Sequence, residues 1–152
     1  ARGGRVACDS NYRPRNWPDP AAARAAMAEL LARADIALGS FDDERALWDD
    51  AEPIATARRI AGRGPREVVV KSAADPAVVL TAESAPELVV PESVIKPVDT
   101  TAAGDSFNAA YLAARLKDVT PIEAARAGHR LAAAVIRHPG AIIPRQAMPA
   151  AI

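Results

Sequence analysis

The sequence predicts an α/β fold, formed by one domain in which helices cover both faces of a sheet in three layers. Two observations point to this prediction, and a third excludes two other kinds of small domain. Short apolar runs alternate with helical patterns through the first half of the chain, which is typical of parallel strands joined by crossover helices. A length of 152 residues suits a single hydrophobic core. A single cysteine, Cys8, excludes both an intramolecular disulfide framework and a cysteine-cluster zinc site.

The first half of the chain alternates strands and helices. Residues 5–9 are apolar-rich and suit a buried strand, and Asp19 with Pro20 then begins a helix as N-cap and first helical residue. The next expected elements are a strand over 35–38, helices over 42–50 and 53–61, and a strand over 67–71. The last strand is the clearest, because its three successive valines are β-branched. This order predicts a parallel sheet.

The second half of the chain changes this order. The elements expected there are strands over 77–81 and 87–90, a loop over 99–104, and helices over 105–116 and 121–137. The two strands are too close together for a crossover helix, so we expect them to pair in antiparallel sense. Thr120 and Glu123 form a capping box at the start of the last helix. Since no repeat or low-complexity linker interrupts the chain, residues 1–152 are expected to form one domain.

The charge and hydropathy of the chain exclude two classes of partner. Nineteen basic and nineteen acidic residues give zero formal net charge, which argues against a protein that binds nucleic acid through bulk electrostatics. No apolar run approaches the roughly 18 residues of a membrane span, and no charged-then-apolar leader opens the chain. We therefore expect neither a nucleic-acid partner nor a membrane partner.

The segment DTTAAGDSF, from Asp99 to Phe107, holds the strongest chemical signal. Small residues precede a helix N-terminus, where backbone N–H groups and the helix dipole can meet an anion. Asp105 lies in the first helical turn, either as a helix cap or as a base beside such an anion site. Taken alone, a capped helix after an alanine-rich loop is the interpretation that general considerations favour. No Walker A pattern occurs in the chain, which excludes a P-loop NTPase.

DTTAAGDSF resembles the C-terminal signature of the PfkB/ribokinase family of sugar kinases, D-T-x-G-A-G-D-x-F, with Ala102 at a position where glycine is common. The stretch from Asp9 to Trp17 resembles the D-x-N-x-R-x-x-x-W pattern of the 2-keto-3-deoxygluconate kinases, and residues 140–145 resemble the end of the same subfamily. The resemblance covers essentially the whole chain, but only the C-terminal half of such kinases. It implies the C-terminal half of a ribokinase-like fold, without the N-terminal half and its lid.

The resemblance implies catalytic roles for the signature. Asp105 corresponds to the general base that takes the proton from the attacking sugar hydroxyl. The backbone N–H groups of the three residues before it correspond to the anion hole for the transferred phosphoryl group; these are Ala102, Ala103 and Gly104.

The resemblance also implies two cation sites. Glu44 falls at the glutamate of the family's N-x-x-E motif, which organises water around Mg²⁺, although Phe41 replaces the asparagine. A solvated residue in an acidic helix start is an equally weighted interpretation of Glu44. Asp99 and Thr101 correspond to positions that line a monovalent-cation (K⁺) site in ribokinase-like members.

Nucleotide and sugar contacts are implied at two loops. The loop KSAADP stands in place of the family's K-x-G-x-x-G, with Ala73 and Pro76 at the glycine positions, and these residues supply a positive φ poorly or not at all. The residues implied to bind nucleotide are Asn11, Lys71, Ser72, Ala73, Asp75 and Gly104. Those implied to bind the sugar are Asn11, Arg13 and Asp105. A guanidinium at Arg13 suits an anionic sugar acid; without the resemblance, a polar loop with an aromatic filler is favoured around Tyr12.

The function implied is a kinase that transfers the ATP γ-phosphoryl group to the 6-hydroxyl of 2-keto-3-deoxygluconate, with Mg²⁺. Its partners are then the sugar acid and ATP, and its location the cytoplasm; homo-oligomer formation is left open. One alternative is a truncated or degenerate homologue that binds only nucleotide or a partner. Another is a ribokinase or fructokinase type, against which the Asp9–Trp17 stretch argues. His129 lies inside an expected helix and is expected to be a packing or surface residue rather than a catalytic one. Trp17 and Trp48 are expected to be core or loop anchors, because neither has a basic context in the sequence.

Overall fold

The computed structural model of the chain describes residues 4–93 and 95–150. These residues form two compact units: the first contains the described residues up to Ala73 together with 77–88, and the second contains 74–76 and the described residues from Val89 onward. Each unit is described by itself.

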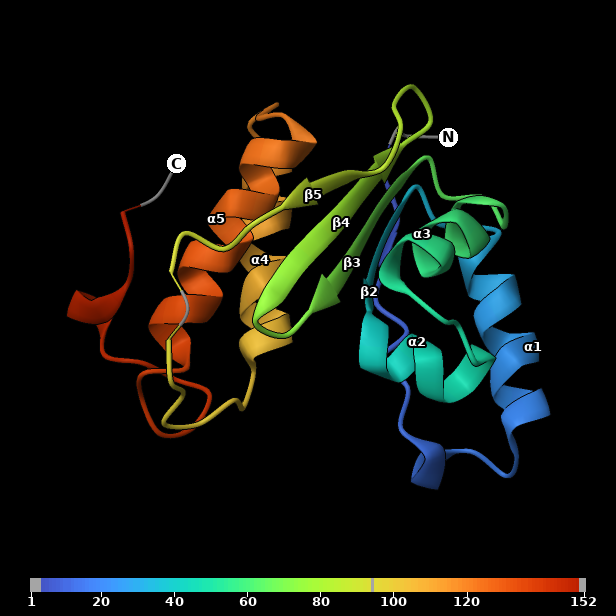
Figure 1. The fold of residues 1–152 in the computed structure, drawn as a ribbon, viewed down its shortest axis with the longest axis horizontal. Coiled ribbons are helices and arrows are strands. Elements are labelled where there is room, and N and C mark those ends of the chain that lie inside the picture. Colours follow the sequence, from blue (N-terminus) through green and yellow to red (C-terminus); the bar gives the residue numbers. More distant parts are fainter. Residues whose placement is uncertain (1–3, 94, 151–152) are drawn as a thin grey trace. The chain divides into compact units, whose positions relative to one another are not determined.

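One sheet of five strands runs through the structure in the order β1-β2-β3-β4-β5 (Figure 1). The strands are β1 (Ala7–Cys8), β2 (Ile36–Ser40), β3 (Glu67–Ser72), β4 (Asp75–Thr81) and β5 (Glu87–Val89). The first three pair in parallel, as the sequence predicts. Ser72 and Asp75 bound a connection so short that β3 and β4 can pair only as an antiparallel hairpin. The sheet is therefore mixed.

Several strand boundaries differ from the prediction; β4 begins at Asp75 rather than at residue 77, and the differences at β1 and β2 have a clear cause in strand pairing. β1 covers only two of residues 5–9, because its ladder with β2 consists of the pairs Ala7–Ile36 and Cys8–Ala37. β2 continues through Gly39 and on to Ser40, since these residues still pair with Val70 and Lys71 of β3. Long-range pairing thus overrides the stop signal that Gly-Ser gives locally.

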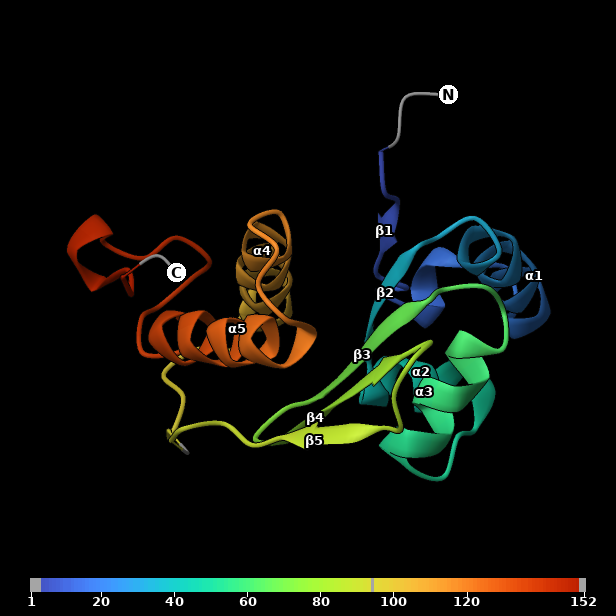
Figure 2. The ribbon, with the colours of Figure 1, turned by 90° about the horizontal axis from the view of Figure 1, so that it is seen from above.

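Three helices of the first unit lie on one face of its strands (Figure 2): α1 (Pro20–Leu31), α2 (Phe41–Trp48) and α3 (Pro53–Ala61). The Asp19 carboxylate accepts a hydrogen bond from the Ala22 N–H at 2.8 Å, which confirms the predicted N-cap. Proline is the first residue of both α1 and α3, where its missing N–H costs nothing.

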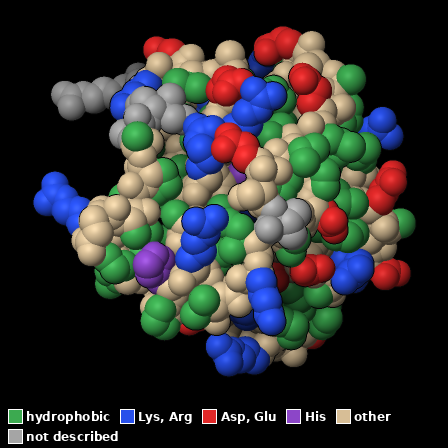
Figure 3. Space-filling model, turned by 60° about the vertical axis from the view of Figure 1, so that its left-hand side comes forward, with side chains coloured by type: hydrophobic (Ala, Val, Ile, Leu, Met, Phe, Trp, Pro, Cys, Tyr) green, Lys and Arg blue, Asp and Glu red, His purple; other side chains and the backbone are tan. Residues whose placement is uncertain are grey.

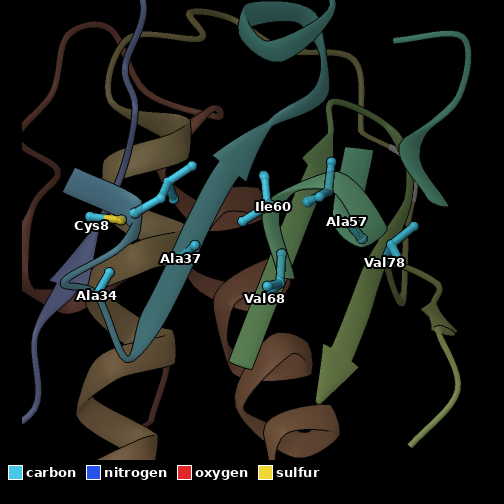
Figure 4. Packing of buried hydrophobic residues seen from close by; sticks show 9 residues of the cluster. Cys8, Ala34, Ala37, Ala57, Ile60, Val68 and Val78 are labelled. Atoms are coloured by element: carbon cyan, nitrogen blue, oxygen red, sulfur yellow. The ribbon is translucent and has the colours of Figure 1, made fainter. Parts of the chain in front are cut away.

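The core of the first unit lies between these helices and the strands (Figure 4). Alternate residues of β3, Val68 and Val70, pack there with Ala57 and Ile60 of α3. The other buried members of this cluster are Cys8, Leu31, Ala34, Ala37 and Val78. Burial, reinforced by neighbouring carboxylates, raises the pKa of the Cys8 thiol to about 11, so this cysteine is a packed apolar group.

The second unit is built on two helices, α4 (Ala103–Arg115) and α5 (Pro121–Val135). The start of α4 lies two residues before the predicted Asp105, because Ala102 takes the N-cap position. At α5 the Thr120 hydroxyl accepts from the Glu123 N–H at 3.3 Å, while the Glu123 carboxylate pairs with Arg126. Only half of the predicted capping box is therefore seen. No helix of the described residues is both long enough and apolar enough to cross a membrane.

Helices α4 and α5 pack closely through Phe107. Its ring meets His129 edge-on, with the centroids 5.2 Å apart, and stacks with Tyr111 at 6.3 Å. The His129 Nε2 lies 3.0 Å from the Val89 carbonyl oxygen, and burial lowers the pKa of this histidine. The predicted packing role of His129 is confirmed. Gly128 permits the approach, because a Cβ there would lie 2.8 Å from three atoms of the Phe107 ring.

We expect Gly128→Ala to destabilise the second unit, although alanine normally favours a helix over glycine by about 1 kcal/mol. Overpacking against an aromatic ring costs about 1–3 kcal/mol, which exceeds that gain. A thermal melt should show a lower Tm for Gly128→Ala than for the parent. The matched test is the double variant with Phe107→Leu, which removes the clash. If the two substitutions are simply additive in free energy, the ring contact is not the cause.

The face shown in Figure 3 carries Lys and Arg side chains interspersed with Asp and Glu. This mixture of signs agrees with the balanced composition of the sequence.

Candidate functional site

The segment that leaves the carboxyl end of β1 is held by two polar contacts. The Asp9 carboxylate accepts from the Lys71 ammonium at 2.9 Å, a pair between the ends of β1 and β3. The Ser10 hydroxyl donates to the Glu44 carboxylate, which belongs to α2. Lys71, implied above to contact the nucleotide, is only 9% exposed. The Asp9 carboxylate compensates its charge within the unit.

Exposed and buried residues alternate along the same segment. Asn11 is exposed at φ 40°, and its N–H donates to Asp9 Oδ1 at 2.9 Å. Tyr12 is 4% exposed and packs with Ala23 and Leu47, so it is the aromatic filler of this loop. The next residue returns to the surface. The two side chains implied to contact the sugar, Asn11 and Arg13, are thus the exposed ones.

The Arg13 guanidinium is anchored at one nitrogen. Its Nη1 donates both to the Tyr12 carbonyl and to Asp43 Oδ2, each at 2.7 Å. The side chain stays 46% exposed, and the structure gives no contact of its Nε or Nη2 within the described residues. Arg13 can therefore present a second face of the fork to an anion.

Glu44 is 3% exposed, so the solvated interpretation of this residue is wrong. One carboxylate oxygen accepts from Ser10 and the other from Arg59 Nη2 at 2.7 Å. Arg59 also pairs with a second carboxylate, that of Asp50. Burial acts to raise the pKa of Asp50, but hydrogen bonds from Arg59 and Thr56 hold that pKa below its ordinary value. Glu44 is thus part of a buried ion-pair network.

Trp48 corrects another expectation. It packs beside Leu47 as an anchor, as predicted, but its surroundings are basic. The guanidinium carbons of Arg63, Arg59 and Arg24 lie 4.5, 4.7 and 5.7 Å from the centre of its ring. Each of these arginines is more than ten positions from Trp48 in the sequence. The residues next to Trp48 in the chain therefore do not reveal its basic surroundings.

The hairpin between β3 and β4 has a left-handed residue although it contains no glycine. Ala73 adopts φ 46°, the left-handed conformation that glycine favours. Pro76 lies within β4, and Asp75 is exposed at the start of that strand. The Ser72 hydroxyl is buried without a hydrogen-bond partner among the described residues.

The signature segment of the second unit begins α4. Ala102, at φ 59°, is the N-cap, and the Ala103 N–H donates to the Thr100 carbonyl at 3.1 Å. Of the three N–H groups implied to form an anion hole, that of Ala103 is therefore used within the loop. Gly104 and Asp105 are exposed in the first turn of the helix. The Asp105 carboxylate makes no hydrogen bond or ion pair that the structure records among the described residues.

Asp99 ties this loop to the chain that follows α5. Its Oδ1 accepts from the Thr101 N–H and its Oδ2 from the Gly140 N–H, both at 2.8 Å. Hydrogen bonding from the Thr101 side chain, followed by that from these two N–H groups, lowers the pKa of Asp99 to about 2. Within residues 4–93 and 95–150 no three His, Cys, Asp or Glu side chains are grouped as metal ligands.

Alanine at a left-handed position is strained, and this predicts stabilising substitutions. A non-glycine residue in that conformation costs about 1–2 kcal/mol, more than the entropy that glycine adds to the unfolded chain. We expect Ala102→Gly and Ala73→Gly each to raise Tm. Ala103→Gly is the matched control, because Ala103 is helical and glycine there should lower stability by about 0.5–1 kcal/mol. A lower Tm for Ala102→Gly would contradict the strain.

Comparison with known proteins decides the family. Residues 1–148 match the model of the pfkB family carbohydrate kinases. The chain belongs to this family. The 2-dehydro-3-deoxygluconokinases of Dickeya dadantii and Escherichia coli K12 are each 44% identical over 154 residues, covering 99% of this chain and 49% of the relative. That of Haemophilus influenzae is 38% identical over 148 residues, covering 97% of the chain and 47% of the relative. The chain thus spans about half the length of these curated relatives and matches their C-terminal half.

Solved pfkB-type structures confirm the fold class. Fructokinase from Vibrio cholerae, with fructose, ADP and calcium bound, superposes with a TM-score of 0.80 at 28% identity, over 91% of this chain and 46% of that one. Aminoimidazole riboside kinase from Salmonella enterica gives 0.83 at 24% identity, over 97% and 50%. The chain therefore has the open mixed sheet with helices of the ribokinase-like kinases, as the signature predicts.

The pfkB signature was within reach of sequence reasoning, whereas the partners of its buried residues were not. Arg59, which pairs with Glu44, and Asp50, which pairs with Arg59, do not stand out in the sequence. The one available signal was an acidic stretch followed by the arginine pair 58–59 on a helix, and such a pattern also fits a solvated face.

Proposed function

We propose that this chain is the phosphoryl-transferring half of a sugar-acid kinase that uses ATP and acts on 2-keto-3-deoxygluconate. The observation that carries the proposal is Asp105, an exposed carboxylate without a protein partner among the described residues, in the first turn of α4 within the family signature. A capping aspartate would accept from backbone N–H groups, as Asp19 does. Asp105 is instead available to a substrate proton.

In this proposal the chemistry needs little from the protein beyond placement. Asp105 accepts the proton of the attacking 6-hydroxyl, and the leaving group is ADP. The N–H groups of Ala102 and Gly104 have no recorded acceptor among the described residues and so suit the anion hole. The Ala103 N–H joins them only if its bond to Thr100 opens.

Among the described residues, Glu44 could contribute to a Mg²⁺ site only through a water molecule. In kinases Mg²⁺ is held chiefly by phosphates and water, with one or two carboxylates, and it neutralises phosphate charge. Glu44 has both oxygens engaged by protein donors, yet a carboxylate has further lone pairs that can hold a water molecule. An Escherichia coli protein assigned as ribokinase II has been solved with ATP and Mg²⁺, with a TM-score of 0.78 at 25% identity. A K⁺ site at Asp99 and Thr101 is likewise proposed only from the resemblance.

The substrate class rests on Arg13 and the named relatives. The relatives' 2-dehydro-3-deoxygluconate and 2-keto-3-deoxygluconate are the same sugar acid, whose carboxylate a guanidinium fork binds well. Asn11 lies beside Arg13 on the exposed side of the loop. For the nucleotide we propose the hairpin residues Lys71, Ser72, Ala73 and Asp75, with Asn11 and Gly104. We further propose that residues 1–152 act as one domain, and that they do so in the cytoplasm.

A second candidate is a homologue that binds nucleotide without catalysis. The specific observation that favours it is the β3–β4 hairpin, where Ala73 and Pro76 replace both glycines of the family pattern. A strained hairpin can weaken nucleotide binding while the fold survives.

The deciding experiment joins this chain to the half that it lacks relative to its relatives. In the chimera, residues 1–152 replace the matching half of the Escherichia coli relative. We expect the chimera to phosphorylate 2-keto-3-deoxygluconate with ATP. The 152-residue chain alone should have very low turnover, because the lid that excludes water belongs, by the resemblance, to the other half. A folded chimera that binds ATP but phosphorylates no sugar supports the second candidate. Preference for ribose or fructose would overturn the substrate class.

A further inference from the structure

A continuous line of buried polar contacts joins α3 to the segment after β1. Arg59 Nε lies 3.0 Å from both Asp50 oxygens, and its Nη2 lies 2.6 Å from Asp50 Oδ2 and 2.7 Å from Glu44 Oε2. Glu44 then accepts from the Ser10 hydroxyl. We call Asp50, Arg59, Glu44 and Ser10 the relay.

The relay is enclosed. The side chains of Glu44, Asp50 and Arg59 are 4%, 10% and 19% exposed. The Trp48 ring covers the guanidinium at 4.7 Å, and the Thr56 hydroxyl donates to Asp50 at 2.8 Å. Removing Arg59 would leave two buried carboxylates without a compensating charge, which is strongly unfavourable. The geometry at Glu44 is therefore tightly determined.

Ser10, at one end of the relay, lies next to the two residues that are proposed to contact the sugar. Between the anchored Ser10 and the buried Tyr12 lies Asn11 at φ 40°, and Arg13 follows. Because the side chains of Ser10 and Tyr12 are held, the backbone of Asn11 has little conformational freedom. The direction in which the Arg13 side chain leaves the surface is set for the same reason. The relay thus controls the two residues proposed to contact the sugar.

We propose that Ser10 and Arg59 are positioning residues, which hold the Asn11–Arg13 turn for the sugar acid through the Glu44 carboxylate. The sugar-binding part rests on the proposed function. It assigns Glu44 a role distinct from organising water around magnesium. In the positioning role, disturbing Ser10 weakens sugar binding. In a role confined to magnesium, the same change affects only the dependence on magnesium and ATP.

The first measurement uses the 152-residue chain and does not depend on its activity. Hydrogen exchange over residues 9–13 is compared in the parent, Ser10→Ala, Arg59→Lys and the control Arg58→Lys, whose side chain is exposed on the same helix. We expect Ser10→Ala and Arg59→Lys each to speed exchange over residues 9–13 by about 2- to 10-fold relative to the parent, which is the effect of losing one hydrogen bond. Exchange in β3 should not change. Unchanged exchange over 9–13, or an equal effect in Arg58→Lys, overturns the proposal.

The second measurement uses the chimera. Ser10→Ala should raise KM for 2-keto-3-deoxygluconate by about 2- to 10-fold and leave kcat near the parent value. KM for ATP should change less than KM for the sugar, because only Asn11 of the turn is also proposed to contact the nucleotide. Faster exchange with an unchanged KM for the sugar would show a merely structural link and overturn the positioning role. A parent chimera that phosphorylates no sugar refutes the proposed function instead, and the exchange data then decide alone whether the relay holds the turn.

Discussion

Replacing Asp105 by asparagine in the chimera should lower kcat for 2-keto-3-deoxygluconate by at least about 100-fold, since a general base contributes about 10²–10⁴-fold. Asparagine keeps the size and capping ability of aspartate and removes its charge and basicity. ATP binding should persist or tighten, because a negative charge beside the γ-phosphate disappears. Steady-state kinetics and a separate ATP titration measure the two effects.

The control for this substitution is Asp118→Asn, at an exposed position beyond the other end of α4. If Asp105 only capped the helix, asparagine would replace it almost without loss, and both turnover and Tm would stay close to the parent. A kcat within a few-fold of the parent would remove Asp105 from the reaction, together with the anion hole built around it. A large loss of Tm would show that the carboxylate stabilises the fold.

Arg13→Ala in the chimera should weaken binding of the sugar acid by about 10- to 150-fold and leave ATP binding nearly unchanged. The reason is the loss of a charge-assisted hydrogen bond, which is worth about 1.5–3 kcal/mol. The Asp43 carboxylate, 2.7 Å from Arg13 Nη1, also loses its partner, but it remains partly exposed and can be solvated. KM for the sugar and the Kd for ATP are the quantities to compare.

Arg15→Ala is the matched control, because Arg15 is an exposed arginine in the next turn of the same segment. It should leave both constants within about 2-fold, the scale of an exposed charge. Arg13→Lys is informative too. It keeps the charge but not the planar fork, so a bidentate contact predicts partial recovery only. An unchanged KM in Arg13→Ala would place the sugar carboxylate elsewhere.

Local sequence signals predicted the elements but not all of their limits. Asp19 and Thr120 cap helices as expected, because a capping side chain acts on backbone two or three residues away. The end of β2 was misplaced, since Gly39 and Ser40 follow their pairing with β3 rather than their own turn preference. Likewise α4 begins at Ala103 because Ala102 takes a left-handed conformation that alanine rarely adopts.

In the candidate site, too, contiguous motifs were predicted from the sequence, whereas pairs of distant residues were not. The signature around Asp105 and the exposed Asn11 and Arg13 can be read from the sequence, because family motifs are contiguous. The pairs Asp9–Lys71 and Ser10–Glu44 could not, since they join residues 62 and 34 positions apart.

By itself, the sequence determined the alternation of strands and helices, most helix starts and the kinase signature, all of which depend on residues close together in the chain. Only the tertiary structure decided that Glu44 is buried against Arg59 and that Trp48 lies among arginines. It also placed Ala73 in the left-handed conformation that glycine favours. The physical reason is that burial and ion pairing depend on which strand ends and helices meet. That is set by the register of β1, β2 and β3, and no short stretch of sequence encodes it.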